Sequence, residues 1–448
     1  MTPELIARYD QRVPRYTSYP TAPHFSHDLQ AATYIQWLSE LSPRTGLSLY
    51  LHVPFCAELC LYCGCNTTIA RSYRPVAAYV DLLEQEIDLV AEHLPGRMDI
   101  AHIHWGGGTP TTLSPEDLKR IMFLLRKSFA IGSAAELAVE IDPRTITAGH
   151  VEALRAAGLN RASLGVQDFD PAVQKSIKRI QSIEQTAKVA RWLREAGVTG
   201  LNLDLMYGLP YQTSDSVMRS VGLALELDPD RIALFGYAHV PWMKRHQALL
   251  PEEALPDAVE RVEQCTAAAS TLLRAGYVQI GIDHFAKPAD PLAVRQREGH
   301  LHRNFQGYTT DEATALIGFG TSAIGSLPQG YVQNAPTTVA YRDAISKGQL
   351  PVVRGAALTE DDRLRRAIIE RLMCDFFVDL DEITARHSEK TDFTPELAAI
   401  DELARDGLVT RRGHSIGIPE DSRLLVRNVC AVFDRYLDSG AVRHSRAI

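Results

Sequence analysis

The chain has 448 residues, of which 45% are hydrophobic and 23% charged, as in ordinary soluble globular proteins. This length predicts two or three domains or one large α/β barrel with appended segments, and the composition excludes a mostly disordered chain, a coiled coil and a collagen-like repeat. The net charge of −8 argues against partners such as nucleic acid or an anionic membrane. Because no apolar run reaches the ~20 residues of a membrane span and the N-terminus lacks a secretory h-region, we expect a cytoplasmic protein.

Strands and helices alternate along most of the chain. Residues 1–45 are Pro- and Tyr-rich, contain a short helical pattern around Tyr34–Leu41, and are predicted to form an N-terminal extension that covers the active site. Alternating and 3.6-residue periodicities then predict strands at 47–54, 100–105, 136–141, 161–166, 201–206 and 232–238, and helices at 76–94, 115–129, 151–158, 182–196, 214–227 and 257–275. Residues 277–282 are a further possible strand. Six or more such units predict a parallel sheet with right-handed crossovers.

Polar residues at the strand ends help to distinguish a barrel from an open sheet. In strand order these ends carry His52 and a cysteine-rich loop, Gly106–Gly108, Glu140, Gln167, Asp204 and Ala238-His239. In βα barrels the chemistry gathers at the C-terminal ends of the strands. Their convergence on one rim favours a partial (β/α) TIM-like barrel over residues 46–350, in the α/β class.

The pattern changes from about Pro351. Residues 359–376, 395–409 and 422–437 are predicted helices, and 410–418 resemble a hairpin, which suggests a small, mostly helical, winged-helix-like domain over 351–448. This region holds 15 Lys and Arg against 18 Asp and Glu, a net charge of −3, so it lacks the basic surface of a nucleic-acid-binding module. We expect it to serve in packing or as a lid.

The seven cysteines are unevenly distributed. Cys56, Cys60, Cys63 and Cys65 fall within ten residues, whereas Cys265, Cys374 and Cys430 are scattered. An odd count in a cytoplasmic chain argues against a disulfide framework. The cluster therefore indicates metal chemistry, and the three scattered cysteines are predicted to be ordinary buried thiols.

The spacing C-x3-C-x2-C supplies three thiolates from one tight loop. A structural zinc site usually takes four N or S ligands, commonly as two separated pairs. Three close ligands better suit a cubane iron–sulfur cluster, which leaves one iron free to bind a small molecule. Cys65 could be a fourth ligand, a substrate-facing thiol or a structural residue, and we favour Cys56, Cys60 and Cys63 as the ligands.

This loop, with an aromatic residue (Tyr62) before its last ligand cysteine, resembles that of the radical S-adenosylmethionine superfamily. The resemblance implies a 4Fe–4S cluster held by three cysteines. It also implies that the amino and carboxylate groups of S-adenosylmethionine bind the fourth iron.

A closer resemblance extends over almost the whole chain. The segments YLHVPFC, CGCN, HWGGGTPT, EIDPR, GVQDF, DLMYGLP, YAHVP, GIDHFA and HRNFQGYTT occur in order between residues 50 and 310, flanked by RYTSYPT and RLLVRN. Together they resemble the oxygen-independent coproporphyrinogen III oxidase (dehydrogenase) family. The resemblance implies loss of carbon dioxide and hydrogen from two propionates of coproporphyrinogen III, which gives protoporphyrinogen IX in haem synthesis.

The resemblance also implies contacts to two molecules of S-adenosylmethionine. The matching positions are Tyr50, Tyr62, Gly107, Gly108, Thr109, Glu140, Gln167, Arg179, Asp204, Ala238 and Ile324. These types are chemically suitable, because a carboxylate such as Glu140 or Asp204 can accept hydrogen bonds from a ribose diol or an ammonium group. Arg179 can pair with a carboxylate, and the glycines let the backbone approach the methionine amino group.

The candidate catalytic residues are Cys65, His52, Phe305 and Gln306, and His52, Arg15, Arg71 or Arg303 are candidate cations for the substrate carboxylates. The implied reaction takes one electron from a reduced donor such as a flavodoxin or ferredoxin and produces a 5′-deoxyadenosyl radical. That radical takes hydrogen from the β-carbon of a propionate, which then loses carbon dioxide and one electron. The family suggests a monomer.

Two other functions remain open from the sequence. A haem-binding chaperone of the same superfamily would share the barrel and cluster motif, but such relatives generally lack Cys65 and the RYTSYPT segment, both present here. A simple iron–sulfur electron carrier is disfavoured by the chain length, the glycine motif and the rim carboxylates.

Overall fold

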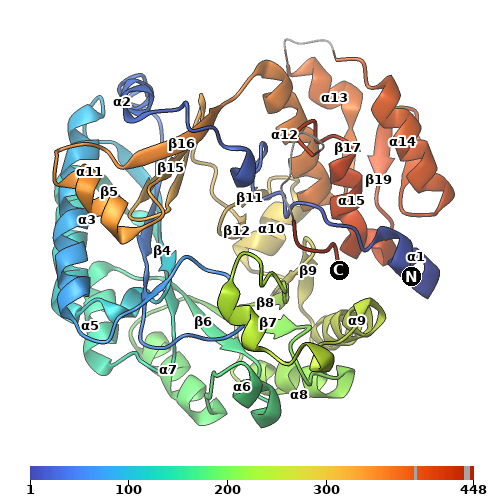
Figure 1. The fold of residues 1–448 in the computed structure, drawn as a ribbon, viewed down its shortest axis with the longest axis horizontal. Helices are drawn as coiled ribbons and strands as arrows, with labels where there is room; N and C mark the ends of the chain where they lie inside the picture. Colours follow the sequence, from blue (N-terminus) through green and yellow to red (C-terminus); the bar gives the residue numbers. More distant parts are fainter. Residues whose placement is uncertain (388–390, 438–443) are drawn as a thin grey trace.

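A twelve-stranded mixed sheet forms the centre of the computed structural model, which describes residues 1–387, 391–437 and 444–448. The strand order is β16-β15-β14-β13-β1-β4-β5-β6-β7-β8-β10-β9. The pairs from β13 through β1 and β4 to β8 are parallel, and strands on either side are antiparallel. Among the described residues β9 and β16 end the sheet without pairing with each other. The predicted partial barrel is therefore confirmed, and the sheet curves around the centre of the molecule (Figure 1).

The parallel strands lie close to their predicted positions. They are β1 (Leu47–Val53), β4 (Asp99–Gly107), β5 (Ala130–Ile141), β6 (Arg161–Gln167), β7 (Gly200–Tyr207), β8 (Arg231–Gly236) and β13 (Ala315–Phe319). β5 begins six residues before its predicted start at 136, and β13 was not predicted. In β1 every residue except Tyr50 is buried, as expected for a strand covered on both faces.

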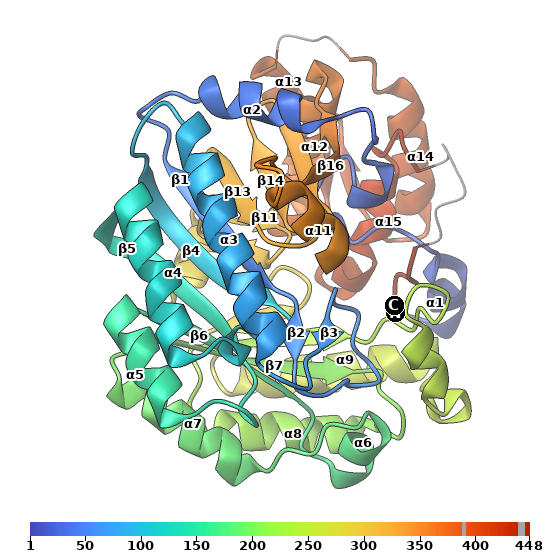
Figure 2. The same ribbon diagram turned by 60° about the vertical axis from the view of Figure 1, so that its left-hand side comes forward.

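The crossover helices cover the outer face of these strands, as Figure 2 shows for α3, α4 and α5. They are α3 (Arg74–His93), α4 (Pro115–Ser128), α5 (Ala148–Ala157), α6 (Pro171–Ser176), α7 (Ile183–Glu195), α8 (Ser214–Leu225) and α9 (Ala258–Arg274). Ser114, Thr147, Ser182, Thr213 and Asp257 cap the starts of α4, α5, α7, α8 and α9, each accepting a backbone N–H with its side chain. Gly158 ends α5 in the left-handed conformation, at the predicted end of the helix 151–158.

Short elements extend the sheet at both ends, and most of them were missed. They are β9 (Val278–Ile280), β10 (His284–Ala286), β14 (Ile324–Leu327), β15 (Gly330–Asn334) and β16 (Val352–Ala357), with the separate pairs β2 (Phe55–Cys56) with β3 (Thr68–Ile69) and β11 (His302–Asn304) with β12 (Gly307–Thr309). The helices α10 (Pro291–Arg297) and α11 (Thr338–Ile345) lie among them. The possible strand 277–282 is the antiparallel edge strand β9. Most of these strands have two to four residues and so carry too few alternating positions to show a period, whereas β15 has five and β16 six.

The C-terminal region contains α12 (Glu360–Asp375), β17 (Phe377–Asp379), α13 (Leu380–Ala385), α14 (Thr394–Arg405), β18 (Thr410–Arg412), β19 (Ser415–Gly417) and α15 (Val426–Ala431). The hairpin β18–β19 follows α14 as predicted, and β17 adds a third strand. The predicted final helix 422–437 is too long: a 3₁₀ turn (Glu420–Leu425) precedes α15, which ends at Ala431. Asp434 accepts the backbone N–H of Tyr436 at 2.9 Å, so a side chain replaces the helical carbonyl there.

The N-terminal segment crosses from the C-terminal region to the sheet. Its helices are α1 (Pro3–Tyr9) and α2 (Ala31–Ser39), the second close to the predicted helical pattern. Ile6, Tyr9, Tyr16 and Tyr19 share a hydrophobic cluster with the C-terminal helices, whereas Tyr34 and Trp37 belong to the barrel core. The domain boundaries at 45 and 350 stay predictions. Among the described residues, no helix combines the length and apolar character needed to cross a bilayer.

A buried carboxylate ties α3 to the antiparallel side of the sheet. Glu86 is 1% exposed and accepts hydrogen bonds from the Gly320 N–H (2.7 Å), the Asn334 side-chain amide (2.6 Å) and the Tyr341 hydroxyl (2.6 Å). Burial raises the pKa of Glu86 to about 7 although these three donors oppose the shift. One side chain thus connects the β13–β14 turn, the end of β15 and α11.

We predict that Glu86 makes the free energy of unfolding fall as the pH rises from about 4 to about 7. Its ordinary pKa in the unfolded chain is about 4.3, so in this window the unfolded state releases a proton that the folded state retains. In the Glu86→Gln variant this contribution disappears, and the decline should be shallower. Urea unfolding of the apoprotein at several pH values measures it, with Glu92→Gln on the exposed face of α3 as the control. Equal slopes for Glu86→Gln and wild type would contradict the assignment.

Candidate active site

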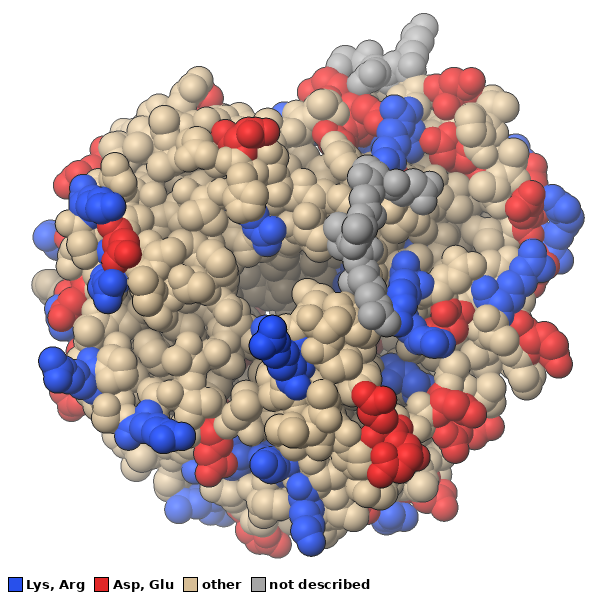
Figure 3. Space-filling model, viewed as in Figure 1, with Lys and Arg blue, Asp and Glu red and all other residues tan. Residues whose placement is uncertain are grey.

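A cavity of about 1710 Å³ lies at the carboxyl ends of the parallel strands. The N-terminal segment, the segment 238–262 and the C-terminal residues 444–448 contribute to its walls, and Figure 3 shows a hollow at the centre of this face. The predicted site residues that line it are Cys56, Cys60, Tyr62, Cys63, Cys65, Gly107, Gly108, Thr109, Glu140, Gln167, Arg179, Asp204, Ala238, Phe305 and Gln306. The polar residues at the strand ends therefore meet at one rim of the barrel, as the sequence predicts.

The cysteine loop is held in place chiefly through its backbone. β2 pairs with β3 at the two ends of the loop, and Leu61 N–H donates to the carbonyl of Ile177 at 2.9 Å. The carbonyls of Tyr62, Cys63 and Cys65 accept hydrogen bonds from Gln247 (2.9 Å), His246 (2.8 Å) and Lys244 (2.7 Å), respectively. This bracing segment, 244–247, was not singled out from the sequence, and no motif marks it.

Each of the three predicted ligand thiols accepts a hydrogen bond. Cys56 Sγ accepts from the Thr109 hydroxyl at 3.5 Å, and Cys63 Sγ from the backbone N–H of Cys65 at 3.4 Å. Cys60 Sγ accepts from Arg144 and Arg179, both at 3.6 Å. Donors aimed at sulfur stabilise thiolate, the form that binds iron, so the donor set fits an iron–sulfur cluster.

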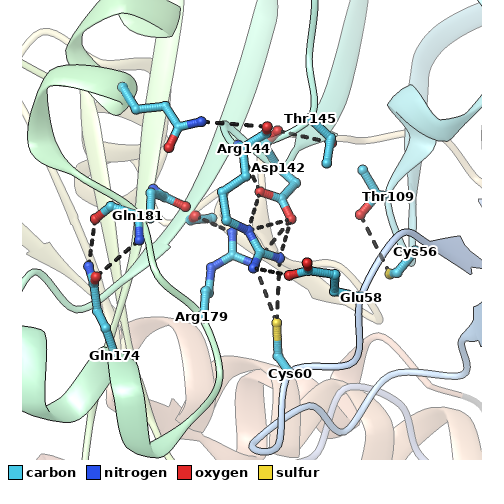
Figure 4. A network of polar contacts seen from close by, with 12 residues as sticks. Cys56, Glu58, Cys60, Thr109, Asp142, Arg144, Thr145, Gln174, Arg179 and Gln181 are labelled. Atoms are coloured by element: carbon cyan, nitrogen blue, oxygen red, sulfur yellow. Dashed lines mark hydrogen bonds and ion pairs between the residues drawn. The ribbon is translucent and has the colours of Figure 1, made fainter.

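The two arginines at Cys60 share one carboxylate (Figure 4). Asp142 lies 2.7 Å from Arg144 and 3.3 Å from Arg179, and the Arg179 guanidinium also donates to the carbonyl of Gly165 at 2.6 Å. Burial alone would raise the pKa of Asp142, but Arg144 and Arg179 hold it below its ordinary value. The exposed Glu58 carboxylate also lies 3.3 Å from Arg144, so two cations and two carboxylates surround the Cys60 sulfur. Asp142 and Arg144 belong to the EIDPR segment but were not predicted as site residues.

The glycine motif, Gly106–Gly108, packs so closely against neighbouring residues of the chain that none of the three positions has room for a Cβ. An added Cβ would lie 2.7 Å from Glu140 Oε1 at Gly106, 2.7 Å from the His52 ring at Gly107 and 2.5 Å from the Phe55 carbonyl oxygen at Gly108. Gly107 also has φ of +109°. The N–H groups of Gly108 and Thr109 donate to the carbonyls of Val53 (2.8 Å) and Phe55 (2.7 Å). The glycines therefore let the end of β4 lie directly against the cysteine loop.

Two carboxylates face the cavity with different electrostatics. Glu140 accepts from His104 at 3.0 Å and from the Gly107 N–H at 3.3 Å; burial opposes ionisation, but these groups hold its pKa below the ordinary value. Asp204 accepts from Ser163 (2.9 Å) and Asn202 (2.7 Å), yet burial and the charge of Glu140 raise its pKa to about 6. Both retain acceptor capacity for a ligand with hydroxyl or ammonium groups.

Tyr50, His52 and Ile324 do not line the cavity wall. The Tyr50 hydroxyl and His52 Nδ1 are 3.0 Å apart, and His52 Nε2 lies 3.0 Å from the carbonyl of Asn66, an acceptor that assigns the proton to Nε2. Burial lowers the pKa of His52, so its ring is neutral and supplies no positive charge at neutral pH. Ile324 begins β14 and packs, as Phe305 also does, against the hydrophobic cluster of Phe25, Tyr331 and Leu358. The roles predicted for these three residues stay predictions.

The remaining candidate site residues lie on several different elements of the fold. Phe305 and Gln306 occupy the turn between β11 and β12, where the Phe305 ring meets Tyr331 edge to face at 6.0 Å. Gln167 ends β6 with φ of +70°, and Ala238 follows β8. Of the proposed substrate cations, Arg15 and Arg303 line the cavity and Arg71 does not. Cys265, Cys374 and Cys430 are buried free thiols, as predicted.

Known proteins resemble this chain over its full length. The Radical SAM superfamily model matches residues 50–224, and the HemN C-terminal domain model matches 358–425. The oxygen-independent coproporphyrinogen III oxidase of Bradyrhizobium diazoefficiens is 53% identical over 450 residues, covering 100% of both chains. That of Paracoccus denitrificans is 42% identical and covers 99% of this chain and 98% of the relative. The solved structure of coproporphyrinogen III oxidase (HemN) from Escherichia coli, described as a radical SAM enzyme, is 40% identical with a TM-score of 0.90, covering 95% of this chain and 100% of that one.

We predict that Gly108→Ala prevents assembly of an iron–sulfur cluster while the fold persists. The added Cβ would meet the Phe55 carbonyl at 2.5 Å, so the backbone of the cysteine loop must move away from β4. Iron and sulfide content after anaerobic reconstitution, with far-ultraviolet circular dichroism as the folding check, measures the effect. Gly222→Ala in α8 is the control, because nothing lies within 4 Å of its added Cβ. Full iron content in Gly108→Ala would contradict the packing argument.

Proposed function

The chain belongs to the oxygen-independent coproporphyrinogen III oxidase family of radical SAM enzymes, and from this premise we propose its reaction. It removes carbon dioxide and hydrogen from two propionates of coproporphyrinogen III and leaves the two vinyl groups of protoporphyrinogen IX, a step of haem biosynthesis. Each propionate gives up one carbon dioxide, one hydrogen atom and one electron. The haem-binding chaperone is not favoured, because the full-length relatives are named as oxidases.

The observation that carries the proposal is the joining of the cysteine loop, the glycine motif and the carboxylates Glu140 and Asp204 in one cavity. Radical SAM enzymes use a 4Fe–4S cluster and S-adenosylmethionine. We assign the cluster to Cys56, Cys60 and Cys63, whose sulfurs already accept hydrogen bonds. When bound, the cluster and S-adenosylmethionine supply the radical that removes hydrogen from the propionate.

The surrounding residues bind and orient two molecules of S-adenosylmethionine. Glu140, ionised at neutral pH, accepts hydrogen bonds from an ammonium group or a ribose diol, and Asp204 serves a second such group. Arg179 pairs with a carboxylate, and Tyr62 supplies an aromatic wall. Residues of the N-terminal segment and of the C-terminus line the cavity, and by covering bound ligands they would limit water near a reactive radical.

The electron comes from a reduced donor such as a flavodoxin or ferredoxin, the enzyme acts in the cytoplasm, and the chain works as a monomer. Cys65, Phe305 and Gln306 line the same cavity as the ligand cysteines, a position from which they would contact substrate or cofactor during the reaction.

Anaerobic turnover tests the reaction. Reconstituted protein, S-adenosylmethionine, a chemical reductant and coproporphyrinogen III should give protoporphyrinogen IX together with 5′-deoxyadenosine and methionine. Cleavage of S-adenosylmethionine without protoporphyrinogen would contradict the proposed substrate. Stable haem binding without any cleavage would instead support the chaperone.

Separate cysteine variants test the cluster ligands. Cys56→Ser, Cys60→Ser and Cys63→Ser should each lose most of the iron bound after reconstitution, because the cluster loses one of its three thiolates. Cys65→Ser should retain the iron content of the wild type. If Cys65→Ser also lost its iron, the assignment of three ligands would fail.

A further inference from the structure

Four arginines from distant parts of the chain line one side of the cavity. They are Arg15 in the N-terminal segment, Arg261 in α9, Arg303 in β11 and Arg427 in α15, and we call them the arginine cage. Figure 1 shows α9, β11 and α15 on the same side of the molecule, toward the C-terminal region. The cage thus forms only when the barrel, the N-terminal segment and the C-terminal helices are assembled.

The cage groups interact electrostatically. Burial, with Arg15 and Arg303 nearby, lowers the pKa of Arg427 to about 10. Asp283 is a carboxylate whose charge acts on Arg15, Arg303 and Arg427, but its own Oδ1 is engaged with His284 Nδ1 at 2.7 Å. Four positive charges therefore face one negative charge, an arrangement unfavourable without a further anion.

Within 1–387, 391–437 and 444–448, no cage guanidinium lies in an ion pair of 4 Å or less. Other buried arginines of this chain do: Arg231 lies 2.7 Å from Asp290, and Arg365 is 2.8 Å from Glu396. Over the same ranges, Nε and Nη1 of Arg303 and of Arg427, with Nε of Arg261, are buried without hydrogen-bond partners. Arg303 instead lies over the Tyr308 ring at 4.5 Å, which orients its guanidinium.

Hydrogen bonds to backbone carbonyls hold two of the cage guanidinium groups in place but do not neutralise their charge. Arg427 donates to the carbonyls of Arg446 and Ala447, and Arg15 to the carbonyl of Gly236 at 3.4 Å. Guanidinium groups bind carboxylates through paired, charge-assisted hydrogen bonds. A ligand with two or more carboxylates would supply the missing charges without any change in the fold.

We propose that the arginine cage binds the carboxylates of the propionates that survive the reaction, an inference that rests on the proposed function. The substrate carries four propionates, of which two are decarboxylated and two remain in the product. A guanidinium on a reacting carboxylate would stabilise its charge in the ground state and oppose loss of carbon dioxide. The cage is therefore suited to the two unreacting carboxylates, and it orients the other two toward the cysteine loop.

Titration with oxidised, air-stable porphyrins tests the cage. Coproporphyrin III has four propionates and protoporphyrin IX has two, and binding of each to the reconstituted holoenzyme is followed by absorbance or fluorescence. Arg303→Gln and Arg261→Gln should each raise the Kd of both porphyrins by about tenfold or more, because each removes a charge-assisted contact. Arg303→Lys, which keeps the charge, should weaken binding less. Arg342→Gln on the exposed surface of α11 is the matched control and should leave both Kd values unchanged.

The outcomes separate this inference from the proposed function. Unchanged Kd values in folded, cluster-containing Arg303→Gln and Arg261→Gln would overturn the cage, while turnover by the wild type would leave the reaction in place. Weaker binding of coproporphyrin III alone would show that the cage holds the reacting propionates, which also overturns the assignment. A wild type that cleaves S-adenosylmethionine but neither converts coproporphyrinogen III nor binds either porphyrin would refute the proposed function itself.

Discussion

The site depends on how closely the cysteine loop lies against the end of β4. Gly108 has space for a hydrogen only, because the carbonyl oxygen of Phe55 occupies the position of a Cβ, and the N–H groups of Gly108 and Thr109 bond to the start of the loop. This contact puts Cys56 within reach of the Thr109 hydroxyl. The same end of β4 meets Glu140 and the neutral His52 ring. One close backbone approach therefore fixes the loop, a ligand sulfur and a rim carboxylate relative to one another.

Much of this arrangement could be predicted because it is encoded by local patterns. Alternation of strand and helix predicted the parallel part of the sheet, and residues at strand ends, such as Glu140 and Asp204, had to share one rim. The cysteine spacing is local as well. The glycines were predicted as residues that let the backbone approach the cofactor. The structure shows that they first let the end of β4 pack against Phe55, His52 and Glu140 of the same chain.

Other features could not be predicted because they arise from contacts between distant segments. The cysteine loop is braced through its backbone carbonyls by the side chains of Lys244, His246 and Gln247. Because every residue of the loop has a backbone carbonyl, such contacts leave no pattern in the sequence of the loop. Arg144 shares Asp142 with Arg179 only after β5 and the segment following α6 come together. The final helix was predicted too long because Asp434 captures a backbone N–H, a competition that periodicity does not register. The net charge of the chain also gave no sign that four arginines from distant segments meet on one side of the cavity.

The central claim is that three cysteines hold a cluster with one iron free for S-adenosylmethionine. The most direct measurement is the electron paramagnetic resonance spectrum of the reduced, reconstituted protein before and after addition of S-adenosylmethionine. The account predicts a clear change in the g values, because the ligand binds the cluster itself. An unchanged spectrum, from protein with full iron content and S-adenosylmethionine at saturating concentration, would contradict it.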